Sequence, residues 1–256
     1  MSTQTGKSCL QIREVRMSFG ALHAVDGVSL DLGLGERHAL LGTNGAGKTT
    51  LFNLITGDLL PTSGQIHLYG HDITALPAHR RCALGIGRTY QIPLLFGGLS
   101  VLENLVIAAR GPRLGGFSLR PIREDADSHL LARELCARVG LGSFAQASVS
   151  LLSHGQKKQL ELGMALATQP SVLLLDEPAA GLSPNDRKTL TGLILDLPRE
   201  LSILFVEHDM EVAMMLADRV TVMKDGRIFA SGFPDDVRKD EQVLRLYMGE
   251  PLELFA

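Results

Sequence analysis

One glycine-rich segment constrains this chain more than any other part of its sequence. The segment fits the pattern G-x-x-x-x-G-K-S/T and reads Gly42-Thr43-Asn44-Gly45-Ala46-Gly47-Lys48-Thr49. It follows a short apolar run at 38–41 and precedes a helical pattern at 50–56. Glycines let successive backbone N–H groups turn inward around an anion, and the start of a helix adds a favourable dipole. The context therefore predicts a strand–loop–helix unit that binds phosphate groups.

This phosphate loop, residues 42–49, also predicts individual contacts to a nucleotide. Lys48 is expected to reach the β- and γ-phosphates, and the hydroxyl of Thr49 is expected to bind Mg²⁺. Thr50, the next residue of the expected helix, completes the set of candidate nucleotide contacts in this segment. The sequence therefore predicts a nucleotide-binding protein.

A second segment carries the acidic groups that such a loop needs. The apolar run 172–175 ends in Asp176 and Glu177. Asp176 suits a metal ion held through water, and Glu177 suits a base that orients or deprotonates an attacking water. Taken alone, two acids after an apolar run are equally well explained as the solvated end of a strand.

The rest of the chain alternates short apolar runs with amphipathic segments, which predicts an α/β protein with a parallel sheet. Strands are expected at Arg37–Leu41, Val172–Leu175, Ile203–Val206, Leu10–Val15, Val25–Leu32 and Gln65–Tyr69, with a turn at Pro61–Gly64. The middle of the chain, 92–152, has helical periodicity, with helices expected at Val101–Arg110 and Asp125–Val139. These patterns predict a helical subdomain inserted into an α/β core.

Composition excludes several other classes of protein. Apolar residues make up 45% and charged residues 21% of 256, which argues against a disordered chain. A net charge of −3 argues against a protein that coats nucleic acid. The three cysteines, Cys9, Cys82 and Cys136, are widely separated, which favours a reducing compartment over a disulfide or zinc framework. No signal peptide or membrane-spanning run is expected from the sequence.

A third motif lies between the phosphate loop and the acidic pair. It reads Leu152-Ser153-His154-Gly155-Gln156 and precedes a helix expected at Lys157–Ala167, so Ser153 and Gln156 also fit a helix capping box. With the three motifs in this order, residues 10–250 resemble the ATP-binding cassette (ABC) ATPases of transporters, whose signature motif is usually Leu-Ser-Gly-Gly-Gln. The resemblance implies ATP and Mg²⁺ as cofactors.

The resemblance also implies a domain organisation. A single cassette is expected at 8–250, with a short tail at 251–256. Within it, a RecA-like parallel-sheet core with an antiparallel β subdomain is expected at 1–91 and 153–250. The inserted α-helical subdomain is expected at 92–152.

Several site residues follow from the resemblance alone. Gln91 matches the glutamine that contacts Mg²⁺ and the attacking water, and His208 matches the histidine that contacts the γ-phosphate. Phe19 lies where the family places an aromatic ring that stacks on adenine, and the alternative is a core phenylalanine beside a turn. Residues 153–156 are implied to complete the ATP site of a facing cassette, so two cassettes enclose two ATP molecules.

The sequence departs from the family pattern at two places. His154 replaces the first glycine of the signature motif, and our hypothesis is that it adds a titratable contact near the nucleotide. The segment Gly181-Leu182-Ser183-Pro184, at the position of the family's D-loop, lacks the usual Ser-Ala-Leu-Asp form. Ser183, Asn185 and Asp186 are therefore only weak candidates there.

Four further segments narrow the resemblance to bacterial importers of hydrophobic amino acids; they are Gly87–Gln91, Ser100–Leu105, Ala180–Pro184 and Leu246–Glu250. This group implies membrane-spanning permease subunits, a second cassette that is identical or different, and indirectly a periplasmic solute-binding protein, with no nucleic acid. The cassette is expected to lie peripherally on the cytoplasmic face of the membrane. Importers of urea or aromatic acids in the same group are an alternative, and a non-transport ABC ATPase is another.

Two segments of the helical region have a choice of explanations. The apolar run Ile92–Phe96 either fills the core of the subdomain or forms a groove for a permease helix. The arginines at 110, 113, 120 and 123 belong either to a solvated loop or to a surface for lipid headgroups or an acidic partner.

Overall fold

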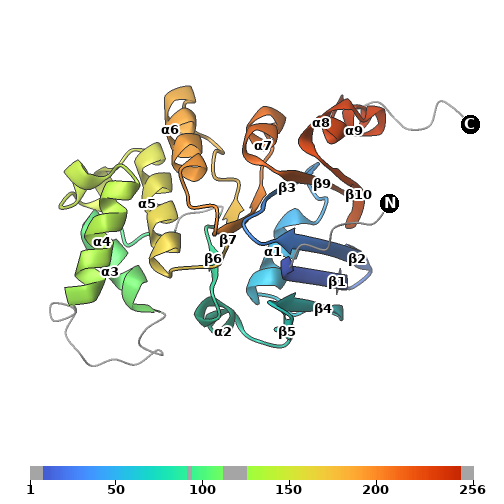
Figure 1. The fold of residues 1–256 in the computed structure, drawn as a ribbon, viewed down its shortest axis with the longest axis horizontal. Helices are drawn as coiled ribbons and strands as arrows, with labels where there is room; N and C mark the ends of the chain where they lie inside the picture. The colour runs from blue at the N-terminus through green and yellow to red at the C-terminus, as the bar shows by residue number, and fades with distance from the viewer. Residues whose placement is uncertain (1–7, 91–93, 112–125, 249–256) are drawn as a thin grey trace, which may run out of the picture. The chain divides into compact units, whose positions relative to one another are not determined.

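The computed structural model describes residues 8–90, 94–111 and 126–248, and the chain forms two compact units. The first unit combines two separate stretches, 1–78 and 199–256. The second unit is the continuous stretch 79–198. Figure 1 labels the helices and strands of both units.

An antiparallel sheet opens the first unit, with the strand order β2-β1-β4-β5. Its strands are β1 (Ser8–Phe19), β2 (Leu22–Gly33), β4 (Ser63–Leu68) and β5 (His71–Asp72). Leu10 and Ile12 on β1 are fully buried and Gln11 between them is half-buried, as expected for a strand with one face on the core. The strands predicted at 10–15, 25–32 and 65–69 are confirmed with longer or shifted ends.

Four strands of a second sheet also belong to the first unit, in the order β10-β9-β3-β8. They are β3 (Arg37–Gly42), β8 (Ser202–Val206), β9 (Arg219–Lys224) and β10 (Arg227–Gly232). β3 pairs in parallel with both β8 and β9, and β10 pairs with β9 antiparallel. Every residue of β3 and of β8 is buried, which agrees with the apolar runs at 39–41 and 203–206, although Arg37, His38 and Ser202 are buried with them.

Within residues 8–78 and 199–248, the first unit also contains four helices: α1 (Lys48–Thr56), α7 (Met210–Leu216), α8 (Pro234–Lys239) and α9 (Glu241–Met248). α1 follows β3 through the phosphate loop, as predicted, and buries Leu51, Phe52, Leu54 and Ile55. It ends at Gly57, whose φ of 83° is the left-handed conformation that commonly closes a helix.

The second unit is mainly helical. It contains α2 (Ala78–Ala83, which begins at the unit boundary), β6 (Ile86–Arg88), α3 (Val101–Arg110), α4 (Ala126–Arg138), η3 (Gly142–Phe144), η4 (Val149–Leu151), α5 (His154–Ala167), β7 (Val172–Asp176) and α6 (Pro184–Leu195). β6 and β7 pair in parallel, and α3, α4 and α5 pack against one another (Figure 1). The two helices predicted in the middle of the chain are confirmed, although α4 ends at Arg138, one residue before the predicted end, and the predicted start Asp125 lies outside the described residues.

One predicted turn is corrected by the structure. Ser63 and Gly64 were expected in a turn at 61–64, but they are the first residues of β4. Gly64 has a φ of 90°, and a Cβ atom there would lie 2.4 Å from the carbonyl oxygen of Glu14 on β1. The glycine is therefore needed for the close approach of two strands rather than for a reversal of the chain.

Among the described residues, no helix combines the length and apolarity that crossing a membrane requires.

Glu36, a partly buried acid between β2 and β3, is expected to make the stability of the protein depend on pH. One carboxylate oxygen of Glu36 accepts a hydrogen bond from the backbone N–H of Gly33 at 2.7 Å, and the other lies 2.9 Å from Nδ1 of His38. Burial acts to raise the pKa of this carboxyl group, but His38, the Gly33 N–H and the charge of Arg219 outweigh it, so the pKa is lowered. A lowered pKa adds stability above the unfolded-state value, and that stability is lost as the pH falls through the folded-state value.

We expect the free energy of unfolding to fall as the pH is lowered from about 5 to about 3, and Glu36→Gln to fall less steeply. At neutral pH the variant should be less stable by about 1–2 kcal/mol, because a charge-assisted contact is lost. Urea unfolding over this pH range measures both effects. Glu200→Gln, at an exposed acid of the same unit, is the matched control. An equal pH slope in wild type and Glu36→Gln would contradict the assignment.

Candidate active site

The phosphate loop lies between β3 and α1, and its glycines adopt conformations that other residues avoid. Gly42, Gly45 and Gly47 have φ values of 149°, 80° and 98°. A Cβ atom on Gly42 would lie 2.3 Å from the carbonyl oxygen of Met223, and one on Gly47 would lie 2.2 Å from that of Ala24. Two of the three glycines are therefore required both by conformation and by space.

Two neighbouring segments of the first unit brace this loop. The backbone N–H of Gly226 donates to the carbonyl of Ala46 at 3.1 Å, and the N–H of Asp26 donates to the carbonyl of Gly226 at 2.8 Å. Gly226 forms the β9–β10 turn with Asp225, and both residues have positive φ. Sequence reasoning missed this brace, although Asp-Gly between two apolar runs is a signal for a tight hairpin.

Lys48 is buried at the start of α1 and its ammonium group is held over the loop. The Nζ atom donates to the carbonyl oxygens of Gly42 at 2.7 Å and Thr43 at 2.9 Å. Thr49 is exposed and Thr50 is half-buried. The structure thus brings the predicted loop residues and Thr50 together at the end of one strand and the start of one helix.

The other two candidates of the first unit are at the ends of strands. Phe19 is the last residue of β1 and is 49% exposed, so the alternative that it is a core residue is wrong. His208 is exposed and follows β8 by two residues. Asp209 next to it caps α7 by accepting hydrogen bonds from the backbone N–H groups of Glu211 and Val212. His208 therefore lies in a short, well-defined connection between a buried strand and a capped helix.

In the second unit, β7 ends at Asp176, which is buried. Its Oδ2 lies 3.1 Å from the guanidinium of Arg88, and its backbone N–H donates to the hydroxyl of Thr89 at 3.2 Å. Its Oδ1 is buried without a hydrogen-bond partner among the residues that the structure describes. Burial raises the pKa of Asp176, and Arg88 acts in the opposite direction. The predicted alternative of a solvated strand end is wrong for this acid.

Glu177 directly follows β7 and is also buried. Its φ is 49°, in the left-handed region that residues with a Cβ rarely adopt. Strained backbone of this kind persists only where the surroundings impose it, and it is often found at functional sites. This strain could not be predicted from the sequence, because a glutamate does not favour the left-handed region.

The motif at 152–156 forms the start of α5. Ser153 is the N-cap, its hydroxyl accepts from the N–H of Gln156 at 3.2 Å, and the Gln156 side chain accepts from the Ser153 N–H at 2.9 Å. The predicted capping box is confirmed, and the helix begins at His154 rather than at Lys157. A Cβ atom on Gly155 would lie 2.5 Å from the side chain of Asp186, so this glycine lets α5 and α6 approach closely.

His154 and the segment 181–184 are neighbours. The side chain of His154 is exposed, and its Nε2 lies 3.4 Å from where a Cβ atom of Gly181 would be. Ser183 is the N-cap of α6 and donates its hydroxyl to the Asp186 carboxylate at 2.7 Å. The structure therefore places the starts of α5 and α6 side by side, a contact that the sequence motifs did not predict.

Some predicted residues lie outside the described part of the chain. These are Gln91, Ile92, Pro93, Arg113, Arg120, Arg123, Gly249 and Glu250. Leu94 and Phe96 are 66% and 50% exposed, so the alternative that they fill the core of the subdomain is wrong. Arg110 is buried at the end of α3, so it does not belong to a solvated basic loop.

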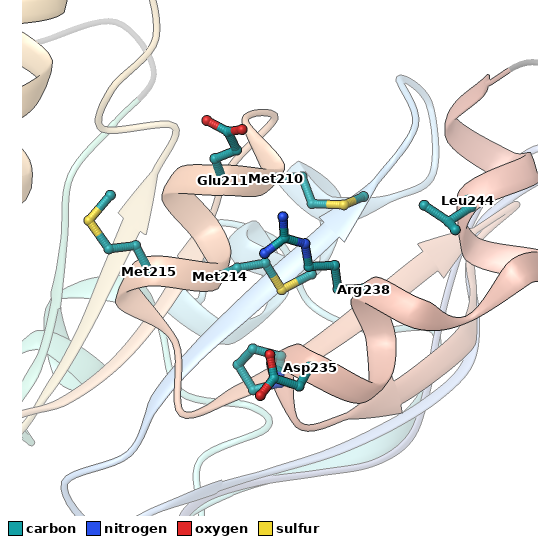
Figure 2. A pocket seen from close by; sticks show the side chains of 8 residues that line it. Met210, Glu211, Met214, Met215, Asp235, Arg238 and Leu244 are labelled. Atoms are coloured by element: carbon teal, nitrogen blue, oxygen red, sulfur yellow. The ribbon is translucent and has the colours of Figure 1, made fainter.

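A groove of about 580 Å³ is lined by residues of α7, α8 and α9 in the first unit (Figure 2). It is lined by Met210, Glu211, Met214, Met215, Pro234, Asp235, Arg238 and Leu244. Flexible methionine side chains let such a groove adapt its shape. Four of the lining residues belong to α7, the helix that begins two residues after His208.

Comparison with known proteins places this geometry in a family. The sequence pattern of the ABC transporter family matches residues 25–180. LivG of Salmonella typhimurium, a high-affinity branched-chain amino acid transport ATP-binding protein, is 39% identical over 94% of this chain and 98% of its own length. BraF of Pseudomonas aeruginosa, which has the same description, is 36% identical with the same coverage of both chains.

Solved structures agree with this placement. The ADP conformation of MJ1267, an ATP-binding cassette of an ABC transporter, matches with a TM-score of 0.85 and 30% identity over 95% of this chain and 99% of that one. A nucleotide-free ATP-binding cassette matches with the same score and identity. The predicted α/β cassette fold is thus confirmed. The chain belongs to the ABC transporter family and is one of its ATP-binding cassettes, the ATPase component of these transporters.

Proposed function

We propose that this cassette hydrolyses Mg-ATP to energise a bacterial importer of branched-chain amino acids or a related small solute. The observation that carries the proposal is the identity of 36–39% with LivG and BraF along nearly the whole of both chains. The residues expected to bind and hydrolyse ATP are all present in this sequence.

ATP binding is assigned to the first unit. The left-handed glycines turn the backbone of the phosphate loop around the phosphates, and the ammonium of Lys48, held by two loop carbonyls, contributes the positive charge. Phe19, half-exposed at the end of β1, is the residue that stacks on adenine. His208 contacts the γ-phosphate.

The residues present fit a bound Mg²⁺. The metal prefers oxygen ligands, and the buried, unpartnered Oδ1 of Asp176 supplies one. The hydroxyl of Thr49 and the side chain of Gln91 are the other proposed ligands. When bound, Mg²⁺ neutralises negative charge on the β- and γ-phosphates.

Hydrolysis is assigned to Glu177, Gln91 and His208. The carboxylate of Glu177 accepts a proton from the attacking water, and the backbone strain at this residue fixes where that carboxylate points. Gln91 orients the same water. His208 holds the γ-phosphate in line with it.

The site is complete only with a partner. Residues 153–156 lie at the N-terminus of α5, where a helix attracts anions, and we propose that they close the ATP site of a second cassette. The exposed Leu94 and Phe96 belong to the second unit and are the proposed contacts for a permease helix. Binding to the permease would hold the cassette on the cytoplasmic face of the membrane, with a periplasmic binding protein delivering the solute.

A second candidate solute follows from one residue. The His-containing signature at 153–156 resembles that of urea importers in the same group. Urea is therefore the alternative cargo.

The test is solute uptake by cells in which Lys48→Ala replaces the native chain. Removing the ammonium group should reduce uptake of radiolabelled leucine at least about tenfold, because ATP no longer binds productively. Loss of urea uptake with normal leucine uptake would favour the alternative cargo. Unchanged uptake of every solute would contradict the importer proposal.

A further inference from the structure

Three consecutive residues just before Gln91, Arg88 to Tyr90, each contact another segment of the second unit. The guanidinium of Arg88 contacts the Asp176 carboxylate at 3.1 Å and lies 4.7 Å from the centre of the Tyr90 ring. Thr89 donates its backbone N–H to the carbonyl of Leu174 at 2.9 Å. These contacts join the end of β6 to the end of β7.

The third contact joins Tyr90 to helix α5. The backbone N–H of Tyr90 donates to Oε1 of Glu161 at 2.6 Å. Glu161 belongs to α5 and is buried, and its other oxygen lies 3.3 Å from Nζ of Lys158, one turn earlier and also buried. Burial raises the pKa of Glu161, while Lys158 and the Tyr90 N–H oppose that rise.

Helix α5 connects this tie to the signature motif. The helix begins at His154, and Glu161 lies seven residues later, which is about 10 Å along the axis and on the same face. An α-helix of this length is a rigid element, so a displacement of its first turn carries Glu161 with it. The hydrogen bond then carries the backbone at Tyr90.

We propose that Glu161 is a positioning residue that couples the signature motif at the start of α5 to the backbone of Tyr90, directly before Gln91 in the chain. The inference rests on the proposed roles of residues 153–156 and Gln91. Closure of a facing cassette onto the start of α5 would then act on the backbone of Tyr90, the residue that precedes Gln91 in the chain. A buried ion pair is often replaceable by apolar residues, but this carboxylate also accepts a main-chain N–H beside a site residue.

Two double variants separate the hydrogen bond from the buried charge. Lys158→Met with Glu161→Gln removes both charges and keeps a side-chain oxygen for the Tyr90 N–H. Lys158→Met with Glu161→Met has a side chain of similar length whose sulfur is a poor acceptor. Both proteins lack the two charges, and only the glutamine protein offers an oxygen to the Tyr90 N–H. A third double variant, Lys158→Met with Glu161→Leu, also removes the acceptor for the Tyr90 N–H and replaces the methionine protein if that protein folds poorly.

The readouts are kcat for ATP hydrolysis, the Kd for ATP, and amide hydrogen exchange of the peptide containing Tyr90. We expect the glutamine protein to resemble wild type. In the methionine protein, kcat should fall about tenfold and exchange at Tyr90 should rise about tenfold. The Kd for ATP should change less than about twofold, because the phosphate loop belongs to the other unit.

Exchange also reports the coupling directly. In a Glu177→Gln background, Mg-ATP should slow exchange at 86–90 together with 153–161, and the methionine substitution should abolish the change at 86–90 alone. Equal kcat values for the two double variants, or the same response at 86–90, would overturn the inference. If wild type itself does not hydrolyse Mg-ATP, the proposed function fails instead.

Discussion

Gly47→Ala is expected to abolish ATP binding and to lower the free energy of unfolding by about 3 kcal/mol or more. The residue has a φ of 98°, and the added methyl group would lie 2.2 Å from the carbonyl oxygen of Ala24 on β2. Neither atom is at the end of a flexible side chain, so the loop or the strand must move. Titration with a fluorescent ATP analogue and urea unfolding measure the two effects.

Gly70→Ala is the matched control for this experiment. Gly70 has a φ of 80°, but no atom lies within 4 Å of its missing Cβ position, and it is outside the candidate site. The substitution therefore adds conformational strain without a clash, and it should cost only about 1–2 kcal/mol and leave ATP binding unchanged. Wild-type affinity for ATP in Gly47→Ala would mean that the observed loop geometry is not the one that binds the nucleotide.

The parts of the site that are formed by residues close together in the sequence could be predicted from the sequence alone. Each of these parts is specified within about ten residues: the phosphate loop, the buried strand before Lys48, the buried strand that ends at Asp176, and the capping box at Ser153. Glycine, apolar runs and S-x-x-Q patterns have direct backbone consequences, so their structures can be predicted without knowing the fold.

Contacts between distant segments could not be predicted in this way. The approach of Ala24 to Gly47 and the hydrogen bond from Tyr90 to Glu161 join residues far apart in the sequence. The choice between core and surface for Phe19 and Leu94 was open for the same reason, because an apolar side chain looks identical in both settings. The left-handed backbone of Glu177 is imposed by its surroundings, and no glycine or asparagine marks it.

Glu177→Gln has the largest expected effect on turnover. Loss of the carboxylate should lower kcat by about a thousandfold, since a general base contributes roughly 10²–10⁴ to rates of this kind. ATP binding should be retained, because the phosphate loop belongs to the other unit. With hydrolysis blocked, Mg-ATP should hold two cassettes together, and light scattering should show a dimer that ADP does not support. Glu134→Gln, at an exposed acid on α4, should hydrolyse ATP normally.

A second substitution at the same position separates catalysis from backbone strain. Glu177→Gly should relieve the strain at φ 49° and raise the free energy of unfolding by about 1 kcal/mol, yet it should be as inactive as the glutamine variant. Opposite effects on stability and turnover at one residue would show that the strain is retained for the carboxylate. Substantial hydrolysis by either variant would instead assign the base to another group. A Glu177→Gln protein that stays monomeric in excess Mg-ATP would contradict ATP-dependent pairing of two identical cassettes.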